Sequence, residues 1–129
     1  AAYLAAERRS DEEIVALEKV AKEFETCVRE ADIEGVLKKD IDFHEKIFMM
    51  ANNKKLYQLI TSLWEQVHRF RVTYVSNYDA SLSLVEEHNR ILQAIKTGDG
   101  ELIFKQYWNY NLRRLGLLFL IQKSRIKSW

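Results

Sequence analysis

The sequence predicts an all-α fold, an antiparallel bundle of about six helices, on the strength of three observations. The 129 residues include no proline and only four glycines, so few positions can break a helix. The apolar residues recur at spacings of three and four, which place side chains on one face of a helix. A composition that is 47% hydrophobic and 30% charged is typical of a globular protein, and this length suits a single domain without internal boundaries.

The first long helix is predicted to begin at Ser10. Ser10 and Glu13 have the spacing of a capping box, in which each side chain satisfies a backbone N–H at the start of a helix. The apolar stripe that follows continues to about Ala31 and consists of Ile14, Leu17, Val20 or Ala21, Phe24, Cys27 and Val28.

The second and third long helices follow after short connections. Asp32 is expected to cap the second helix, and Asn52 and Asn53 to end it, because asparagine tolerates a left-handed backbone. The third helix is expected from about Lys54 to Asn77. The apolar faces are predicted to carry Ile33, Leu37, Ile41, His44, Phe48 and Ala51 in the second helix, and Leu56, Ile60, Leu63, Val67, Phe70, Tyr74 and Tyr78 along the third.

Two further helices complete the expected bundle. A second capping-box pattern, Ser83 with Glu86, predicts a helix start at Ser83, and Gly98 is expected to end that helix after Leu84, His88, Ile91 and Ile95 line one face. Asp99 is expected to cap a last helix over about 100–123. The segment 115–121 is apolar on all sides, so we expect it to be central in the bundle or covered by a second subunit in a homodimer.

Charge and composition bear on the possible partners. The formal net charge is +1 and there is no long basic run, so this chain is not expected to bind nucleic acid itself. The longest nearly uncharged run, 115–122, is about a third of a membrane span. The single Cys27 can form no internal disulfide, which favours a reducing, cytoplasmic compartment.

Three polar residues form the candidate site. Asp40 and His44 are four residues apart, which stacks them on one helix face where they can share a metal ion. His88 stands in the apolar stripe of another helix and is a third candidate ligand. Two histidines and a carboxylate suit zinc, nickel, iron or manganese, although a histidine at a helix contact is often a hydrogen-bonded core residue. The remaining histidine, His68, is interpreted as a surface or boundary residue.

Four segments in order resemble the effector domain, or FCD domain, of FadR-type GntR transcription regulators. They are LAAER with DEE at 4–13, DIDFH at 40–44, ANNKKL at 51–56 and EHNRILQAIKTGD at 87–99. The resemblance implies an effector-binding and dimerisation domain over 1–129, preceded in the regulator by a DNA-binding winged helix. It implies a regulator and not an enzyme, and DNA contact only through that upstream domain.

The resemblance also implies a divalent metal, zinc or nickel first and iron or manganese as alternatives, bound by an Asp and three histidines and completed by a small carboxylate effector. Asp40, His44 and His88 match three ligand positions, whereas the last family histidine falls at Tyr110, where the sequence departs from the pattern. A tyrosine hydroxyl with a pKa near 10 is a poor zinc ligand at neutral pH. The site therefore has three protein ligands completed by water or effector, or it has lost the metal.

Other side chains are candidates for binding the effector. A carboxylate effector calls for a metal or an arginine fork, and Arg71 is the basic residue nearest the bundle side of its helix. The remaining candidates, which could line a pocket or approach the site, are Tyr74, Tyr107, Tyr110 and Asn111. The alternatives are a metal-free member of the family that binds an acyl ligand, a metal-dependent helical-bundle enzyme, and a purely structural dimerisation bundle.

Overall fold

The computed structural model describes the backbone of residues 1–75 and 77–106, and the side chains of these ranges apart from residues 65–71 and 73–75. Within these ranges the chain forms five helices and the first turns of a sixth at residues 100–106, with no strand. The five helices are α1 (Ala2–Arg8), α2 (Asp11–Arg29), α3 (Ile33–Met50), α4 (Lys54–Val75) and α5 (Tyr78–Thr97). The predicted all-α fold is confirmed.

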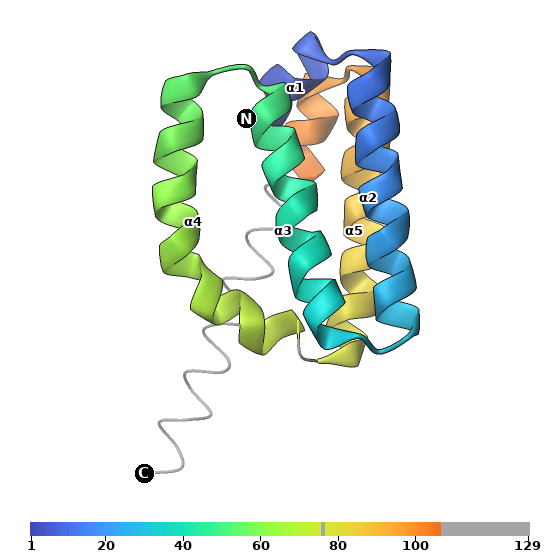
Figure 1. Ribbon diagram of the computed structural model, residues 1–129. Coiled ribbons are helices and arrows are strands. Elements are labelled where there is room, and N and C mark those ends of the chain that lie inside the picture. Colours follow the sequence, from blue (N-terminus) through green and yellow to red (C-terminus); the bar gives the residue numbers. More distant parts are fainter. Residues whose placement is uncertain (76, 107–129) are drawn as a thin grey trace.

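The helices form an antiparallel bundle with α3 and α5 at its centre. From α2 to α5 each helix runs opposite to the one before it (Figure 1). Both α3 and α5 pack against α1 and α4, and α2 packs against both of them. Because α3 carries Asp40 and His44 and α5 carries His88, this arrangement brings the candidate ligands to the middle of the bundle.

The helix starts at Ser10 and Asp32 are confirmed. The backbone N–H of Ser10 donates to Oε2 of Glu13 at 2.9 Å, and the backbone N–H of Glu13 donates to Oγ of Ser10 at 3.2 Å, so the capping box is complete. The carboxylate of Asp32 accepts from the backbone N–H of Gly35 at 3.0 Å. These contacts satisfy backbone N–H groups that have no partner within the helix.

The predicted helix ends are also confirmed. Asn52, directly after the last turn of α3, has φ +46°, and Gly98 ends α5 with φ +71°. Asparagine and glycine adopt this left-handed backbone at the lowest steric cost. Asp99 then accepts from the backbone N–H of Leu102 at 2.9 Å and caps the helix that begins at residue 100.

The prediction that a helix starts at Ser83 is wrong. The helix α5 begins five residues earlier, because the side chain of Asn77 already accepts from the backbone N–H of Ala80 at 3.2 Å and caps it. Ser83 lies inside α5, where its hydroxyl donates to the carbonyl of Asp79 at 3.3 Å. A capping-box spacing therefore also occurs within a helix, where it caps nothing. Tyr78, predicted to extend the preceding helix, belongs to α5.

The buried face of α3 differs from the predicted stripe. Ile33, predicted to be inside, is 51% exposed, whereas His44 and Ala51 are buried as predicted. The buried residues of the helix are Val36, Asp40, Phe43, His44, Ile47 and Met50. Asp40, predicted to share one helix face with His44, is buried beside it, and Phe43, Ile47 and Met50 are buried residues that the predicted stripe did not include.

The side chains of α4 are less buried than predicted. Leu63 is 52% exposed, whereas Leu56 and Ile60 are half-buried. The predictions for Val67, Phe70 and Tyr74 lie outside the described side chains, and those for the last helix beyond residue 106, including the apolar segment 115–121, lie outside the described residues.

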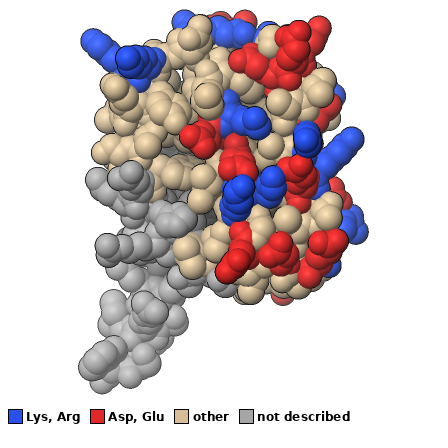
Figure 2. Space-filling view, viewed as in Figure 1, with Lys and Arg blue, Asp and Glu red and all other residues tan. Residues whose placement is uncertain are grey.

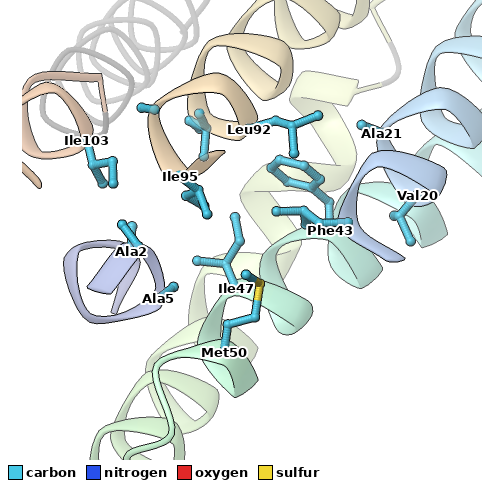
Figure 3. Packing of buried hydrophobic residues seen from close by; sticks show 14 residues of the cluster. Ala2, Ala5, Val20, Ala21, Phe43, Ile47, Met50, Leu92, Ile95 and Ile103 are labelled. Atoms are coloured by element: carbon cyan, nitrogen blue, oxygen red, sulfur yellow. The ribbon is translucent and has the colours of Figure 1, made fainter. Parts of the chain in front are cut away.

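The main hydrophobic core lies between α1, α2, α3 and α5. Ala2 and Ala5 of α1 face Ile47 and Met50 of α3 and Ile95 of α5, with Ile103 beside them (Figure 3). Alanine side chains are small enough to let α1 approach the two central helices closely. A second cluster near the other end of α2 contains Phe24, Val28, Val36 and Leu84, with the half-buried Cys27 beside it.

The surface charge is mixed in sign. In the view of Figure 2, lysine and arginine are interspersed with aspartate and glutamate over α2 and α3, and the part of the surface over α4 that is not grey is mostly uncharged. No continuous basic patch is visible on this face, in keeping with the net charge of +1. None of the described helices combines the length and the apolar character that a membrane span requires.

Candidate functional site

Asp40, His44 and His88 form a cluster in the centre of the bundle, named here the buried triad. Each of the three is 1% exposed. Nε2 of His88 lies 3.1 Å from Oδ1 of Asp40, and Nε2 of His44 lies 3.6 Å from the same oxygen. One potential ligand atom from each residue lies within 4.8 Å of the other two. The structure thus brings together all three residues predicted as metal ligands.

The backbone explains why these side chains meet. Asp40 and His44 are one turn apart on α3, so both project from the same side of that helix. His88 lies on the buried stripe of α5, flanked by Leu84 and Ile91, which are 0% and 1% exposed. The carboxylate of Asp40 links the two helices by lying at hydrogen-bond distance from the His88 ring.

Two phenylalanine rings hold the His88 imidazole. The ring of Phe43 stacks on it with centroids 4.2 Å apart and planes inclined by 18°, and the ring of Phe24 lies 4.4 Å away, tilted by 54°. Both phenylalanines are fully buried. Contacts with two buried rings restrict rotation of the imidazole.

The His44 imidazole has a different environment. Its ring centroid lies 5.1 Å from that of Trp64 on α4 and 6.4 Å from that of Phe48. Trp64 and Phe48 are half-buried and pack edge to face with centroids 5.6 Å apart. His44 therefore lies on the side of the triad that faces α4, and His88 on the side that faces the core.

The charge of Asp40 needs a partner at this depth. Burying a carboxylate is costly unless an opposite charge or hydrogen-bond donors compensate for its lost hydration. Among the described residues, the buried polar or charged side chains are the triad and Ser81. The imidazoles of His88 and His44 lie 3.1 and 3.6 Å from Oδ1 of this carboxylate, and a bound cation would add an opposite charge.

The donor set fits a divalent metal ion. Ligand atoms about 2.1 Å from a zinc ion lie roughly 3.0 to 3.4 Å apart when they subtend angles between 90° and the tetrahedral value. The separations of 3.1 and 3.6 Å from Asp40 Oδ1 to the two imidazole nitrogens are close to this range, and ligand atoms of all three residues lie within 4.8 Å of one another. One carboxylate and two imidazoles are also ligands that zinc, nickel, iron and manganese accept.

The side chains of the other predicted site residues lie outside the part of the chain that the structure describes. Arg71 and Tyr74 belong to α4, but their side chains, like that of His68, lie outside the described set. Tyr107, Tyr110 and Asn111 lie outside the described residues.

The aromatic neighbours of the triad were not singled out in the sequence as site residues. Phe43 directly precedes His44 in the DIDFH segment, and this adjacency is a signal that could have been used. Trp64 carries no such signal, because its proximity to His44 depends on how α4 packs against α3.

Fold and site together define the class of protein: a helical bundle that builds a buried polar site from facing helices, as bundles do for ligands and metals. Among known protein families, the FCD domain matches residues 1–108. The chain therefore belongs to the FCD domain family, the C-terminal domain of GntR/FadR-family regulators, as its resemblance predicted. FCD domains are the effector-sensing parts of regulatory proteins. Comparisons with curated proteins and with solved structures give no match.

Proposed function

We propose that this domain senses a small organic acid, which binds to a divalent metal held by Asp40, His44 and His88 and thereby controls DNA binding by a winged helix elsewhere in the regulator. The observation that carries this proposal is the complete burial of three metal-binding side chains whose donor atoms lie within 4.8 Å of one another. Zinc or nickel suits this donor set best, and iron or manganese is an alternative.

The residues of the triad have separate roles in this function. Asp40 contributes the negative charge and joins α3 to α5, while His44 and His88 contribute neutral nitrogen donors. A bound divalent ion would supply a positive centre that attracts a carboxylate group. Phe43 and Phe24 keep the His88 ring in place, so the donor atoms are already oriented before a ligand arrives.

The helix α1 offers a path from the site toward the DNA-binding part. The guanidinium of Arg8 donates to the carbonyls of Ala51 and Asn52, at 2.7 and 3.0 Å, at the end of α3. The guanidinium of Arg9 lies against Gly98 at the end of α5, where an added Cβ would come within 2.7 Å of its Nη1. We infer that a ligand bound between α3 and α5 changes their relative placement, and that α1 transmits the change to a preceding winged helix.

The proposal extends to the oligomeric state and the location of the regulator. We propose that the regulator acts as a homodimer in the cytoplasm, and that the effector changes the relative placement of its two DNA-binding heads. We propose that DNA contact is made through the winged helices, in keeping with the net charge of +1 and the mixed charges on the face that Figure 2 shows.

Elemental analysis of the purified domain tests the metal site. We expect about one zinc or nickel ion per chain in the unaltered protein and none in the His44→Ala and His88→Ala variants, because each removes one of the few donors. Ser81→Ala is the matched control, since Ser81 is a buried polar residue of α5 whose hydroxyl donates to the Asn77 carbonyl at 3.1 Å. It should keep the metal.

Thermal unfolding provides an independent measure of the same site. A metal present at about a hundred times its dissociation constant stabilises a folded protein by about 2.7 kcal/mol. Removal of the metal by a chelator should therefore lower the melting temperature of the unaltered domain, and leave that of His88→Ala unchanged. Absence of bound metal after incubation with zinc, nickel and manganese would contradict the proposal and favour a metal-free, acyl-binding domain.

A further inference from the structure

The aromatic residues around the buried triad differ in burial from one side to the other. Phe24 and Phe43, which enclose His88, are fully buried, whereas Phe48 and Trp64, which lie beside His44, are half-buried. The core side of the triad is thus closed by well-packed rings. Among the described neighbours of the triad, the less buried aromatic side chains are therefore those beside His44, Phe48 and Trp64.

The described surroundings of the triad are apolar and aromatic. Besides the triad, Ser81 is the one buried polar side chain in the described part of the chain, and its hydroxyl already donates to the Asn77 carbonyl at 3.1 Å. The rings near the triad therefore offer flat apolar faces to a ligand. The phenyl rings of Phe24, Phe43 and Phe48 carry no hydrogen-bonding group, so a polar part of a ligand placed against them would lose hydration without replacement.

We propose that Trp64 forms the wall of the effector site on the α4 side, and that it selects carboxylates that carry a flat apolar body such as an aromatic ring. This inference rests on the proposed function, because the triad would bind the carboxylate end. The indole of Trp64 lies 5.1 Å from the His44 ring, so a group extending from the triad toward α4 meets its face or edge. Contacts between aromatic rings favour such a ligand beyond the burial of its area.

The position of Trp64 is tested by fluorescence with metal ions alone. The chain has three tryptophans, and the double variant Trp108→Phe, Trp129→Phe leaves Trp64 as the sole one. Nickel has unpaired electrons and quenches a nearby indole, whereas zinc has a filled d shell and serves as the matched control. We expect nickel to remove most of the Trp64 emission and zinc to leave it largely unchanged, and His44→Ala to abolish the nickel effect. If the double variant does not fold, the difference between the unaltered domain and Trp64→Phe measures the same emission.

The selectivity is tested with benzoate and acetate, which share a carboxylate and differ in the aromatic ring. In calorimetric titrations of the nickel-loaded domain, we expect benzoate to bind more tightly than acetate. Trp64→Leu should reduce that preference by about two- to twelvefold, the range that one aromatic pair contributes, with little change for acetate. Leu63→Ala is the control, because Leu63 is the neighbouring residue on α4 and is 52% exposed. It should keep the preference.

The outcomes separate this inference from the proposed function. Nickel that binds by elemental analysis but does not quench Trp64, or a benzoate preference that is absent or survives Trp64→Leu, would overturn the role of Trp64 and leave the metal site intact. No nickel binding at all would overturn the proposed function, and this inference with it.

Discussion

Replacing Phe43 by alanine should destabilise the domain strongly, because its ring connects the hydrophobic core to the buried triad. The ring is 0% exposed, stacks on His88 at 4.2 Å and belongs to the main core cluster. A buried phenylalanine truncated to alanine costs about 3–5 kcal/mol, from lost burial and from the cavity that remains. This is a large part of the roughly 5–15 kcal/mol by which a domain is stable, and it shifts the folding equilibrium by about a hundredfold to several thousandfold.

Urea unfolding followed by circular dichroism measures this loss. With a destabilisation of about 4 kcal/mol and a denaturant dependence of about 2 kcal/mol per molar, the midpoint should fall by about 2 M. Met49→Ala, on the same helix, is the control, because Met49 is 64% exposed and its truncation should cost less than about 0.5 kcal/mol. Equal midpoints for the two variants would refute the reasoning that Phe43 is a central packing residue.

Two further predictions concern the helix caps and the pH dependence of stability. Ser10→Ala should lower the free energy of unfolding by about 1 kcal/mol because it removes the capping hydroxyl of α2. Ser83→Ala should cost less, since Ser83 lies within α5. Equal melting temperatures for the two variants would contradict this assignment of the caps. The ammonium of Lys96 donates to Glu18, and this contact lowers the pKa of the Glu18 carboxyl below its usual value of 4.5. A lowered carboxyl pKa stabilises the folded state above the unfolded pKa and the contribution disappears as the pH falls through the folded pKa. The difference in unfolding free energy between the unaltered domain and Lys96→Met should therefore shrink in acid. Urea unfolding at a series of pH values measures it. A difference that stays constant from neutral pH to below the usual pKa of the Glu18 carboxyl would contradict this prediction.

Predictions from the sequence succeeded where the controlling interaction is local. The cap at Ser10, the left-handed residues Asn52 and Gly98 and the cap at Asp99 each depend on contacts within about four residues. The failure at Ser83 has the same origin, because Asn77 offers an earlier local cap and two candidate caps compete for one helix start. The spacing alone does not decide between them.

The face of α3 shows the limit of periodicity. Its sequence contains apolar residues on several sides, and the predicted stripe included Ile33, which is 51% exposed. Which side is buried depends on α1, α2 and α4 packing around the same helix, and no spacing within α3 contains that information. The polar residue Asp40 lies on this buried face, where the imidazoles of His44 and His88 are its neighbours.

The sequence by itself determined the helical class, most helix ends, the family resemblance and the three residues of the triad. These follow from short-range backbone chemistry and from residue types at characteristic spacings. Only the tertiary structure decided that His88 approaches Asp40 to 3.1 Å across 48 residues of chain, that Phe24 and Phe43 enclose it, and that Trp64 lies beside His44. Such contacts join helices distant in sequence, and their geometry results from the packing of whole helix faces, which local patterns do not encode.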